Sequence, residues 1–268
     1  MPDEESITAA QAYEDHLVGA VFGPWARRVV DLGAPKPGET VLDVACGTGI
    51  GARLVAPKVS PMGCVISTDV NDGMICVAKK SAEAANLPTD VTLNWHAVPA
   101  EQQLVDEASI DLCLYMQGPQ FVTDPPAAMK EVHRALKPGG RLAASMWNEM
   151  PTNKGHYAIA EALAARDIKP AMKPFSMGDP DVARSLFANA GFNIKYFDTG
   201  EFMATFLSVR DFVNGVAAGA PATRHAIAQL SPEDHGAFIK DVQNTLAGYV
   251  TANGVVLPTS AHLILAHR

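Results

Sequence analysis

The most constraining feature of the sequence is a glycine-rich segment that directly follows a short apolar run. Thr40–Ala45 reads TVLDVA, a pattern typical of a buried strand, and it leads into Cys46-Gly47-Thr48-Gly49. Glycines at such a turn let backbone N–H groups approach a ligand without obstruction by side chains. Residues 47–52 also fit the loose G-x-G-x-x-A pattern of nicotinamide- and flavin-binding turns. The segment therefore predicts a strand, a ligand-binding turn and a helix, in that order.

Short apolar runs and longer amphipathic runs alternate from residue 40 to residue 147. Further strands are expected at 65–69, 91–97, 110–117 and 141–147, and helices are expected from the turn to Pro57, from Asn71 or Asp72 to about Ala85, and from Asp124-Pro125 to the turn at Lys137–Gly140. Alternation of this kind favours a parallel sheet with helices on both faces. The predicted fold is α/β, with a doubly wound, mostly parallel sheet.

Beyond residue 147 the alternation breaks. We expect helices at 155–166 and 180–190, strands at 192–197 and 261–266, an extended piece at 202–207 and a mostly helical stretch at 208–250. The strand total is then seven. The predicted organisation is covering helices at 1–35, a core at 36–150, a lid at 151–180, a core helix and strand at 181–207, a helical cap at 208–258 and a final core strand at 259–268.

Composition excludes several classes of function. The 268 residues carry 21 basic and 29 acidic side chains, a net charge of −8, which argues against nucleic acid as a partner. Four scattered cysteines predict neither a disulfide scaffold nor a metal site. The acidic start MPDEESITAA and the lack of an apolar run of membrane-spanning length predict a cytoplasmic protein without a membrane span. The oligomeric state stays open, a dimer included.

Five motifs in the same order resemble those of class I S-adenosylmethionine-dependent methyltransferases. They are DVACGTG at 43–49, the acid Asp69 after the second strand, Ala100-Glu101 after the third, the fourth strand at 110–117, and the Leu136–Gly140 turn before the fifth. The resemblance covers about residues 40–147. It is strongest to the branch with the ubiquinone and menaquinone C-methyltransferases and many natural-product methyltransferases. It implies their Rossmann-like fold, with helical insertions that form a cap.

The resemblance also implies a set of cofactor contacts. Asp69 would accept hydrogen bonds from the ribose hydroxyls, the turn would meet the amino-acid head, and Gln117 would lie near the sulfonium. The residues expected to bind S-adenosylmethionine are Asp43, Ala45, Gly47, Gly49, Asp69, Val70, Ala100, Glu101 and Gln117. Pro99 departs from the family, which usually has an acid there. His96 could replace that contact or serve in packing.

The N-terminal segment QAYEDHLVGAVFGPWARR admits two interpretations. The resembling branch often has a similar pattern of Tyr13, Phe22 and Trp25 on helices that close over the cofactor, which makes these three further candidates for cofactor contact. The alternative is that Phe22 and Trp25 only dock an amphipathic helix on the core.

These observations predict methyl transfer from S-adenosylmethionine to a small, largely apolar acceptor, on O, N or C. For a hydroxyl acceptor, His156 is the first candidate for a catalytic base and His16 the second. The alternative that neither touches the substrate stays open. Two other functions also stay open, a nicotinamide- or flavin-linked oxidoreductase and a non-enzymatic module that binds S-adenosylmethionine.

Overall fold

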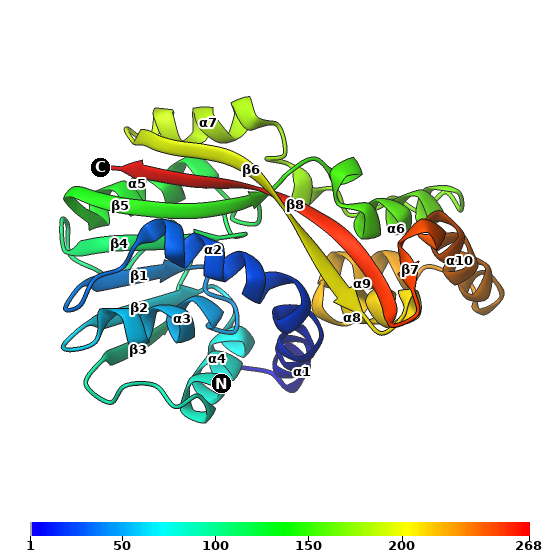
Figure 1. Ribbon diagram of the computed structural model, residues 1–268, viewed down its shortest axis with the longest axis horizontal. Helices are drawn as coiled ribbons and strands as arrows, with labels where there is room; N and C mark the ends of the chain where they lie inside the picture. Colours follow the sequence, from blue (N-terminus) through cyan, green and yellow to red (C-terminus); the bar gives the residue numbers. More distant parts are fainter. Residues whose placement is uncertain (1) are drawn as a thin grey trace.

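Within residues 2–268, eight strands form one sheet, and seven of them follow the order β3-β2-β1-β4-β5-β8-β6 (Figure 1). The computed structural model describes residues 2–268. The strands are β1 (Thr40–Val44), β2 (Cys64–Asp69), β3 (Thr92–Ala97), β4 (Ile110–Met116), β5 (Leu136–Trp147), β6 (Asn193–Phe206) and β8 (Gly254–His267), and the two-residue β7 (Val250–Thr251) pairs with β8. β1 to β5 are parallel, and β8 is antiparallel to both β5 and β6. The prediction of a mostly parallel α/β sheet is confirmed.

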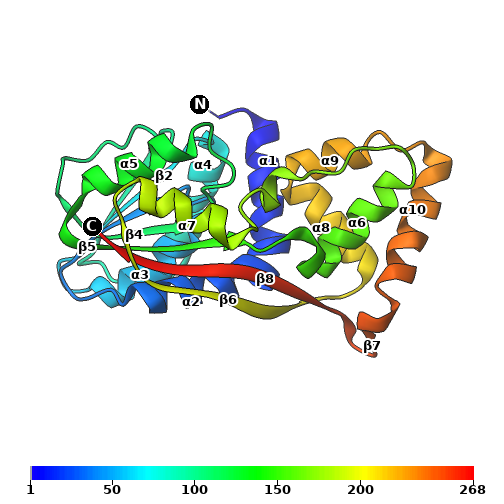
Figure 2. The ribbon, with the colours of Figure 1, turned by 90° about the horizontal axis from the view of Figure 1, so that it is seen from above.

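Helices cover both faces of this sheet and build a cap beyond one end of it (Figure 2). They are α1 (Glu4–Tyr13), the π-helix η1 (Glu14–Phe22), α2 (Gly23–Gly33), α3 (Ile50–Val59), α4 (Asp72–Ala84), α5 (Pro125–Ala135), α6 (Lys154–Ala164), α7 (Pro180–Asn189), α8 (Val209–Gly219), α9 (Pro221–Ile227) and α10 (Pro232–Thr245). α2 and α3 lie on one face and α5 and α7 on the other. None of the helices within residues 2–268 has the length and apolar character that crossing a bilayer requires.

The apolar run of β4 explains why both faces are covered. Side chains alternate across a strand, so Leu112 and Leu114 belong to the apolar cluster with α2 and α3. Cys113 and Tyr115 belong to the opposite cluster, with α5 and α7. All four side chains are fully buried. A strand buried on both faces reads as a continuous apolar run, as the sequence at 110–117 predicted.

Helix caps account for where several helices begin. The Asn71 side chain accepts hydrogen bonds from the backbone N–H groups of Gly73 and Met74, at the start of α4. Asp124 caps α5 and Ser231 caps α10 in the same way. The caps of α4 and α5 confirm the helix starts predicted at Asn71 and Asp124, because a polar side chain at this position satisfies otherwise unpaired N–H groups.

Two strands are longer than predicted. β6 runs unbroken through 198–201, where the sequence DTGE indicated a break, and β8 begins at Gly254 rather than near residue 261. The two strands pair from Asn193 opposite His267 to Phe206 opposite Val255, with one irregularity between Ile194 and Tyr196. The pairing is regular through 198–201, so backbone hydrogen bonds hold the polar stretch extended. The predicted boundary at residue 258, between the helical cap and the final strand, is therefore wrong.

Smaller corrections concern two prolines. α3 does not stop at Pro57 but continues to Val59, with the proline in its last turn. β5 begins at Leu136, which pairs with Ile110, and the pairing then shifts so that Arg141 lies opposite Leu112. The predicted turn at residues 137–140 is thus an irregular first part of the strand rather than a separate connection.

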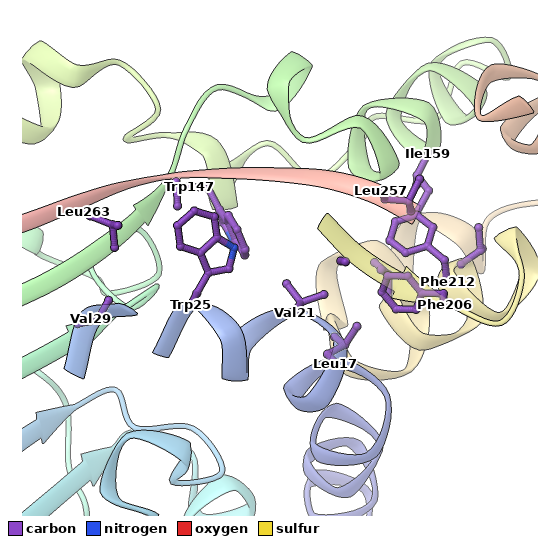
Figure 3. Packing of buried hydrophobic residues seen from close by; sticks show 14 of the residues in the cluster. Leu17, Val21, Trp25, Val29, Trp147, Ile159, Phe206, Phe212, Leu257 and Leu263 are labelled. Atoms are coloured by element: carbon purple, nitrogen blue, oxygen red, sulfur yellow. The ribbon is translucent and has the colours of Figure 1, made fainter. Parts of the chain in front are cut away.

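The paired strands β6 and β8 extend beyond the other strands and carry the cap formed by α6, α8, α9 and α10 (Figures 1 and 2). Phe206, Phe212, Leu257 and Ile159 lie together there (Figure 3). α1 and η1 lie between the sheet and this cap. α2 instead packs against β4 and β5, so only the first part of the predicted covering segment 1–35 can cover a site.

Candidate functional site

A cavity of about 560 Å³ lies between the carboxyl ends of the strands and the cap. This is the edge at which doubly wound sheets bind ligands. One part of its wall, the cofactor lobe, is formed by the ends of β1, β2 and β4, the residues after β3 and the first part of α4. The other part, the acceptor lobe, is formed by η1, the end of β5, α6, residues 170–175, α8 and the start of α9. The volume is within the usual range of small-molecule sites.

The glycine-rich turn forms a concave backbone surface in the cofactor lobe. Ala45, Gly47 and Gly49 all have positive φ, of 53°, 54° and 79°. Ala45 and Gly47 line the cavity. A Cβ built on Gly47 would lie 3.8 Å from the ring of Tyr13. Gly47 thus has the left-handed backbone conformation that favours glycine, and the Tyr13 ring lies close to it.

Asp69 holds the turn in place at the end of β2. Its Oδ2 accepts a hydrogen bond of 2.9 Å from the N–H of Gly47, and its Oδ1 accepts one of 2.9 Å from the N–H of Asn71. Burial raises the pKa of this carboxyl, and the two N–H donors oppose the rise. Asp69 lines the cavity, and each oxygen retains a lone pair for a further donor.

Gln117 has an uncommon backbone conformation at the end of β4. Its φ is +51°, which costs free energy for a residue with a side chain. Its N–H donates to the Ser145 carbonyl over 2.8 Å, and its Oε1 accepts from Gln120 Nε2 over 2.9 Å. The buried Nε2 of Gln117 has no partner within residues 2–268, and the residue lines the cavity. An unpaired buried donor at this place fits a ligand that supplies an acceptor.

The segment after β3 forms a further part of the cofactor lobe. Val70, Ala100 and Glu101 line the cavity, as does Pro99 with its apolar ring. The Glu101 Oε1 accepts hydrogen bonds from the N–H groups of residues 123 and 124, at 3.0 and 2.9 Å. His96 is not among the cavity-lining residues, so the structure does not place it as a substitute for the missing acid.

The N-terminal cover is joined to the turn by an ion pair that the sequence did not indicate. Arg53 Nη2 lies 2.6 Å from Glu14 Oε1, and Arg53 Nη1 donates to the Thr48 carbonyl over 2.6 Å. Both charged side chains are largely buried. Beside them, the rings of Tyr13 and Phe22 stack at 4.8 Å and line the cavity. Burial, with Asp69 and Glu14 nearby, raises the pKa of Tyr13.

Three of the predicted cofactor contacts lie outside the cavity wall. Trp25 is buried in the core, where its indole N–H donates to Thr259 Oγ1 over 3.0 Å. The Asp43 carboxylate lies behind the turn, where burial raises its pKa to about 7. A Cβ on Gly51, at the start of α3, would lie 2.5 Å from that carboxylate. Gly49 faces Trp95, whose ring would lie 2.8 Å from a Cβ there. The structure places all three in supporting rather than contacting positions.

The two candidate bases, His156 and His16, lie in different places, and only His156 lines the cavity. His16 is exposed on η1, lies against Gly215 of α8, and does not line the cavity, so it is wrongly placed to remove a proton there. His156 lines the acceptor lobe, edge-on to Phe175 and Phe212 at centroid distances of 5.6 and 5.9 Å. Burial lowers the pKa of His156 to about 4, which makes it a weaker proton acceptor than an ordinary histidine.

The lowered pKa predicts how stability depends on pH. Between pH 6.5 and 4 the unfolded chain binds a proton at His156 that the folded chain does not, so the free energy of unfolding falls as pH falls. Between pH 7.5 and pH 5, we expect the free energy of unfolding of the wild type to fall by about 2 kcal/mol more than that of His156→Phe. Urea unfolding of both proteins at the two pH values measures this. The raised pKa of Asp43 makes the free energy of unfolding rise as pH falls. Because Asp43 is present in both proteins, its contribution cancels in the comparison. Equal pH dependence in both proteins would contradict the burial of His156.

Hydrogen bonds anchor both ends of the predicted lid at 151–180 to β8. The Asn153 side chain bonds to both backbone groups of Ser260, at 3.0 and 3.2 Å, and anchors the start of α6 to β8. At the other end, His262 Nε2 lies 2.7 Å from the Gly178 carbonyl. α6 itself packs on β8 and α10. Within the predicted lid, residues 165–177 are therefore the part that we expect to move.

Limited chymotrypsin digestion should test whether this segment moves. We expect cleavage after Phe175 to slow when cofactor and acceptor are bound, because ligands order weakly packed segments that cover them. Lys173 Nζ donates to the Phe121 carbonyl over 2.9 Å and holds the segment across the cavity mouth. Cleavage after Tyr249, which does not line the cavity, is the control. Equal rates with and without ligands would contradict a moving lid.

Comparison with known proteins gives a consistent result. Residues 42–144 match the family model described as "Methyltransferase domain". The ubiquinone/menaquinone biosynthesis C-methyltransferase UbiE of Hydrogenovibrio crunogenus (strain DSM 25203 / XCL-2) is 31% identical over 153 residues, which are 53% of this chain and 59% of that protein. Aklanonic acid methyltransferase DauC of Streptomyces sp. (strain C5) is 34% identical over 129 residues, 48% of this chain and 57% of that protein.

The similarity to solved structures covers almost the whole chain. The YcgJ protein from Bacillus subtilis has a TM-score of 0.59 at 16% identity, over 91% of this chain and 98% of that chain. At this identity the similarity shows the fold. The chain spans about half the length of the curated relatives that it matches.

Proposed function

The chain carries a methyltransferase domain over residues 42–144, and we propose that it transfers the methyl group of S-adenosylmethionine to a small, largely apolar acceptor. One observation carries the proposal, which is that a single cavity joins two unlike lobes. The cofactor lobe offers backbone at Gly47, the Asp69 carboxylate and the unpaired amide of Gln117. The acceptor lobe is mainly apolar.

The residues of the cofactor lobe fit S-adenosylmethionine. That molecule combines a ribose diol, an amino-acid head and an adenine, and it supplies a methyl group on a positively charged sulfur. Asp69 would accept hydrogen bonds from the diol, and the turn at Ala45–Gly47 would meet the head. Val70, Ala100 and the ring of Pro99 offer apolar surface to the base. Tyr13 and Phe22 would cover the bound molecule and exclude water.

Positioning is the main catalytic contribution that we propose for this chain. Holding two reactants in line can supply roughly 7–11 kcal/mol of a reaction barrier. η1 serves this purpose because it lines the acceptor lobe with Val21 while the Glu14–Arg53 pair ties it to the glycine-rich turn. A displacement of the turn would therefore also displace η1 in the wall of the acceptor lobe.

Two measurements test the proposal against its rivals. Calorimetry should show binding of S-adenosylhomocysteine and no binding of NAD or FAD. Binding of NAD or FAD would instead indicate an oxidoreductase. Mass spectrometry of reactions with S-adenosylmethionine and a panel of apolar acceptors should show a product heavier by one methylene. Cofactor binding with no methylated product across the panel would favour a non-enzymatic binding module.

A further inference from the structure

We infer that Trp147 and Phe22 bind the positively charged sulfur of S-adenosylmethionine through the faces of their aromatic rings. Trp147 is the last residue of β5, and Phe22 is the last residue of η1. The inference rests on the proposed methyl transfer and deepens it. It names the residues that distinguish the charged methyl donor from its uncharged product, S-adenosylhomocysteine.

The two rings belong to a row of three that runs from the cofactor lobe into the acceptor lobe. The row begins at Tyr13, whose ring lies 3.8 Å from the position that a Cβ would take on Gly47. The Phe22 ring stacks on Tyr13, with centroids 4.8 Å apart, and the Trp147 ring lies 5.9 Å from Phe22 at a tilt of 55°. All three aromatic residues line the cavity. Phe22 is thus the middle member of the row, where the two lobes meet.

The pairing of β4 with β5 holds Trp147 close to the cofactor lobe. Met116 lies opposite Ser145, and the N–H of Gln117 donates to the Ser145 carbonyl over 2.8 Å. Trp147 follows Ser145 by two residues, so its side chain projects from the same face of β5. Its ring lies edge-on to the buried Trp25, with centroids 6.2 Å apart, and this contact restricts how the ring can turn (Figure 3).

The sulfur of the methyl donor must lie where the two lobes meet. It carries the methyl group that passes to the acceptor, while the rest of the cofactor would occupy the cofactor lobe. A nucleophile in the acceptor lobe can attack this methyl group in line only across that boundary. The middle of the aromatic row is therefore the part of the chain that we expect beside the sulfur.

The charges of the cavity wall leave the acceptor lobe without a carboxylate. Asp69 and Glu101 are the acidic residues among those that line the cavity, and both belong to the cofactor lobe. Both already accept hydrogen bonds from backbone N–H groups. A positive charge that leaves water for an apolar wall needs a compensating partner. The faces of aromatic rings carry negative potential and attract cations, most strongly where water is excluded.

The inferred contact depends on the charge of the sulfur. In the donor the sulfur is a sulfonium with a positive charge, whereas in the product it is a neutral thioether. The aromatic faces attract the first and gain little from the second. Such a preference would favour the replacement of bound product by a new molecule of donor.

Calorimetry with three ligands at pH 7 tests the inference. The ligands are S-adenosylmethionine, S-adenosylhomocysteine and sinefungin, in which a charged amine takes the place of the methyl group on sulfur. The measured quantity is the affinity of each charged ligand divided by the affinity of S-adenosylhomocysteine for the same protein. A change in the folded fraction leaves this ratio unchanged, because it affects all three affinities by the same factor.

Phe22→Leu and Trp147→Leu remove an aromatic face and keep an apolar side chain. We expect each to lower both ratios by about threefold to tenfold, as for the loss of a cation–π contact away from water. Trp147→Phe keeps a ring and should lower them less. Phe175→Leu is the matched control, because Phe175 lines the acceptor lobe beside His156 and outside the row. It should keep the wild-type ratios.

The inference and the proposed function can fail separately. If all three ligands bind but both leucine variants keep ratios within about twofold of the wild type, the inference is overturned and the proposed function stands. A ratio that falls for S-adenosylmethionine and not for sinefungin overturns it too, because the rings would then recognise the methyl group rather than the charge. An equal fall in Phe175→Leu has the same consequence. Wild-type protein that binds none of the ligands would contradict the proposed function itself.

Discussion

Asp69→Ala is expected to weaken binding of S-adenosylmethionine by about a hundredfold or more. The carboxylate would receive hydrogen bonds from two ribose hydroxyls, and bonds to charged groups contribute roughly 1.5–3 kcal/mol each. About 1.4 kcal/mol corresponds to a factor of ten in affinity. The variant also leaves the N–H groups of Gly47 and Asn71 without their acceptor. The turn that should meet the amino-acid head would then lose its support as well.

Calorimetry of the wild type and two further variants isolates this effect. Asp69→Asn keeps an acceptor oxygen but removes the charge, and should fall between wild type and Asp69→Ala. Asp72→Ala removes a nearby exposed carboxylate that does not line the cavity, and should bind the cofactor like the wild type. A loss of less than threefold in Asp69→Ala would refute the ribose assignment. Circular dichroism of each variant verifies that it is folded.

Local sequence patterns were sufficient to predict the parallel strands β1 to β5 and the starts of α4 and α5. The strand and turn at 40–49 follow from a buried apolar run that meets glycines with left-handed backbone. Caps such as Asn71 and Asp124 are equally local, because the side chain bonds to N–H groups two or three residues further along. Patterns of this kind can be recognised in a single sequence, because they depend only on neighbouring residues.

Contacts between distant segments were not predictable in this way. Glu14 and Arg53 are far apart in the sequence, and no local pattern couples an acid on η1 to a base on α3. The long pairing of β6 with β8 likewise depends on strand partners, which overrode the local tendency of Asp198–Glu201 to end a strand. The position of the cap over the cavity follows from that pairing, so it could not be predicted from the sequence either.

The glycine-rich motif shows why a correct motif can still mislead about contacts. Asp43 and Gly49 belong to it, yet neither lines the cavity. Gly49 has a φ of +79° and leaves room for the Trp95 ring, while Asp43 is buried behind the turn at the start of α3. Both residues shape the turn, whereas other residues of the motif face the cavity. A sequence pattern identifies the whole turn and does not distinguish the residues that shape it from those that face a ligand.

Trp25→Ala is expected to lower the free energy of unfolding by about 3–5 kcal/mol, the range for removing a buried aromatic side chain. Trp25 is 1% exposed and lies edge-on to Trp147, with ring centroids 6.2 Å apart (Figure 3). Its indole N–H donates to Thr259, and the Arg28 guanidinium lies 5.0 Å from its ring. Urea unfolding followed by circular dichroism measures the loss. Trp25→Phe keeps part of the packing and should lose less.

The same variants separate a structural role of Trp25 from the cofactor contact that the sequence suggested. Because Trp25 lies outside the cavity, Trp25→Phe should bind S-adenosylhomocysteine within about twofold of the wild type. Phe22→Ala is the matched comparison, since Phe22 lines the cavity and stacks on Tyr13, and its loss should weaken binding more. Loss of cofactor affinity in Trp25→Phe with unchanged stability would instead mean that the N-terminal helices close further over the cofactor, bringing Trp25 into contact with it.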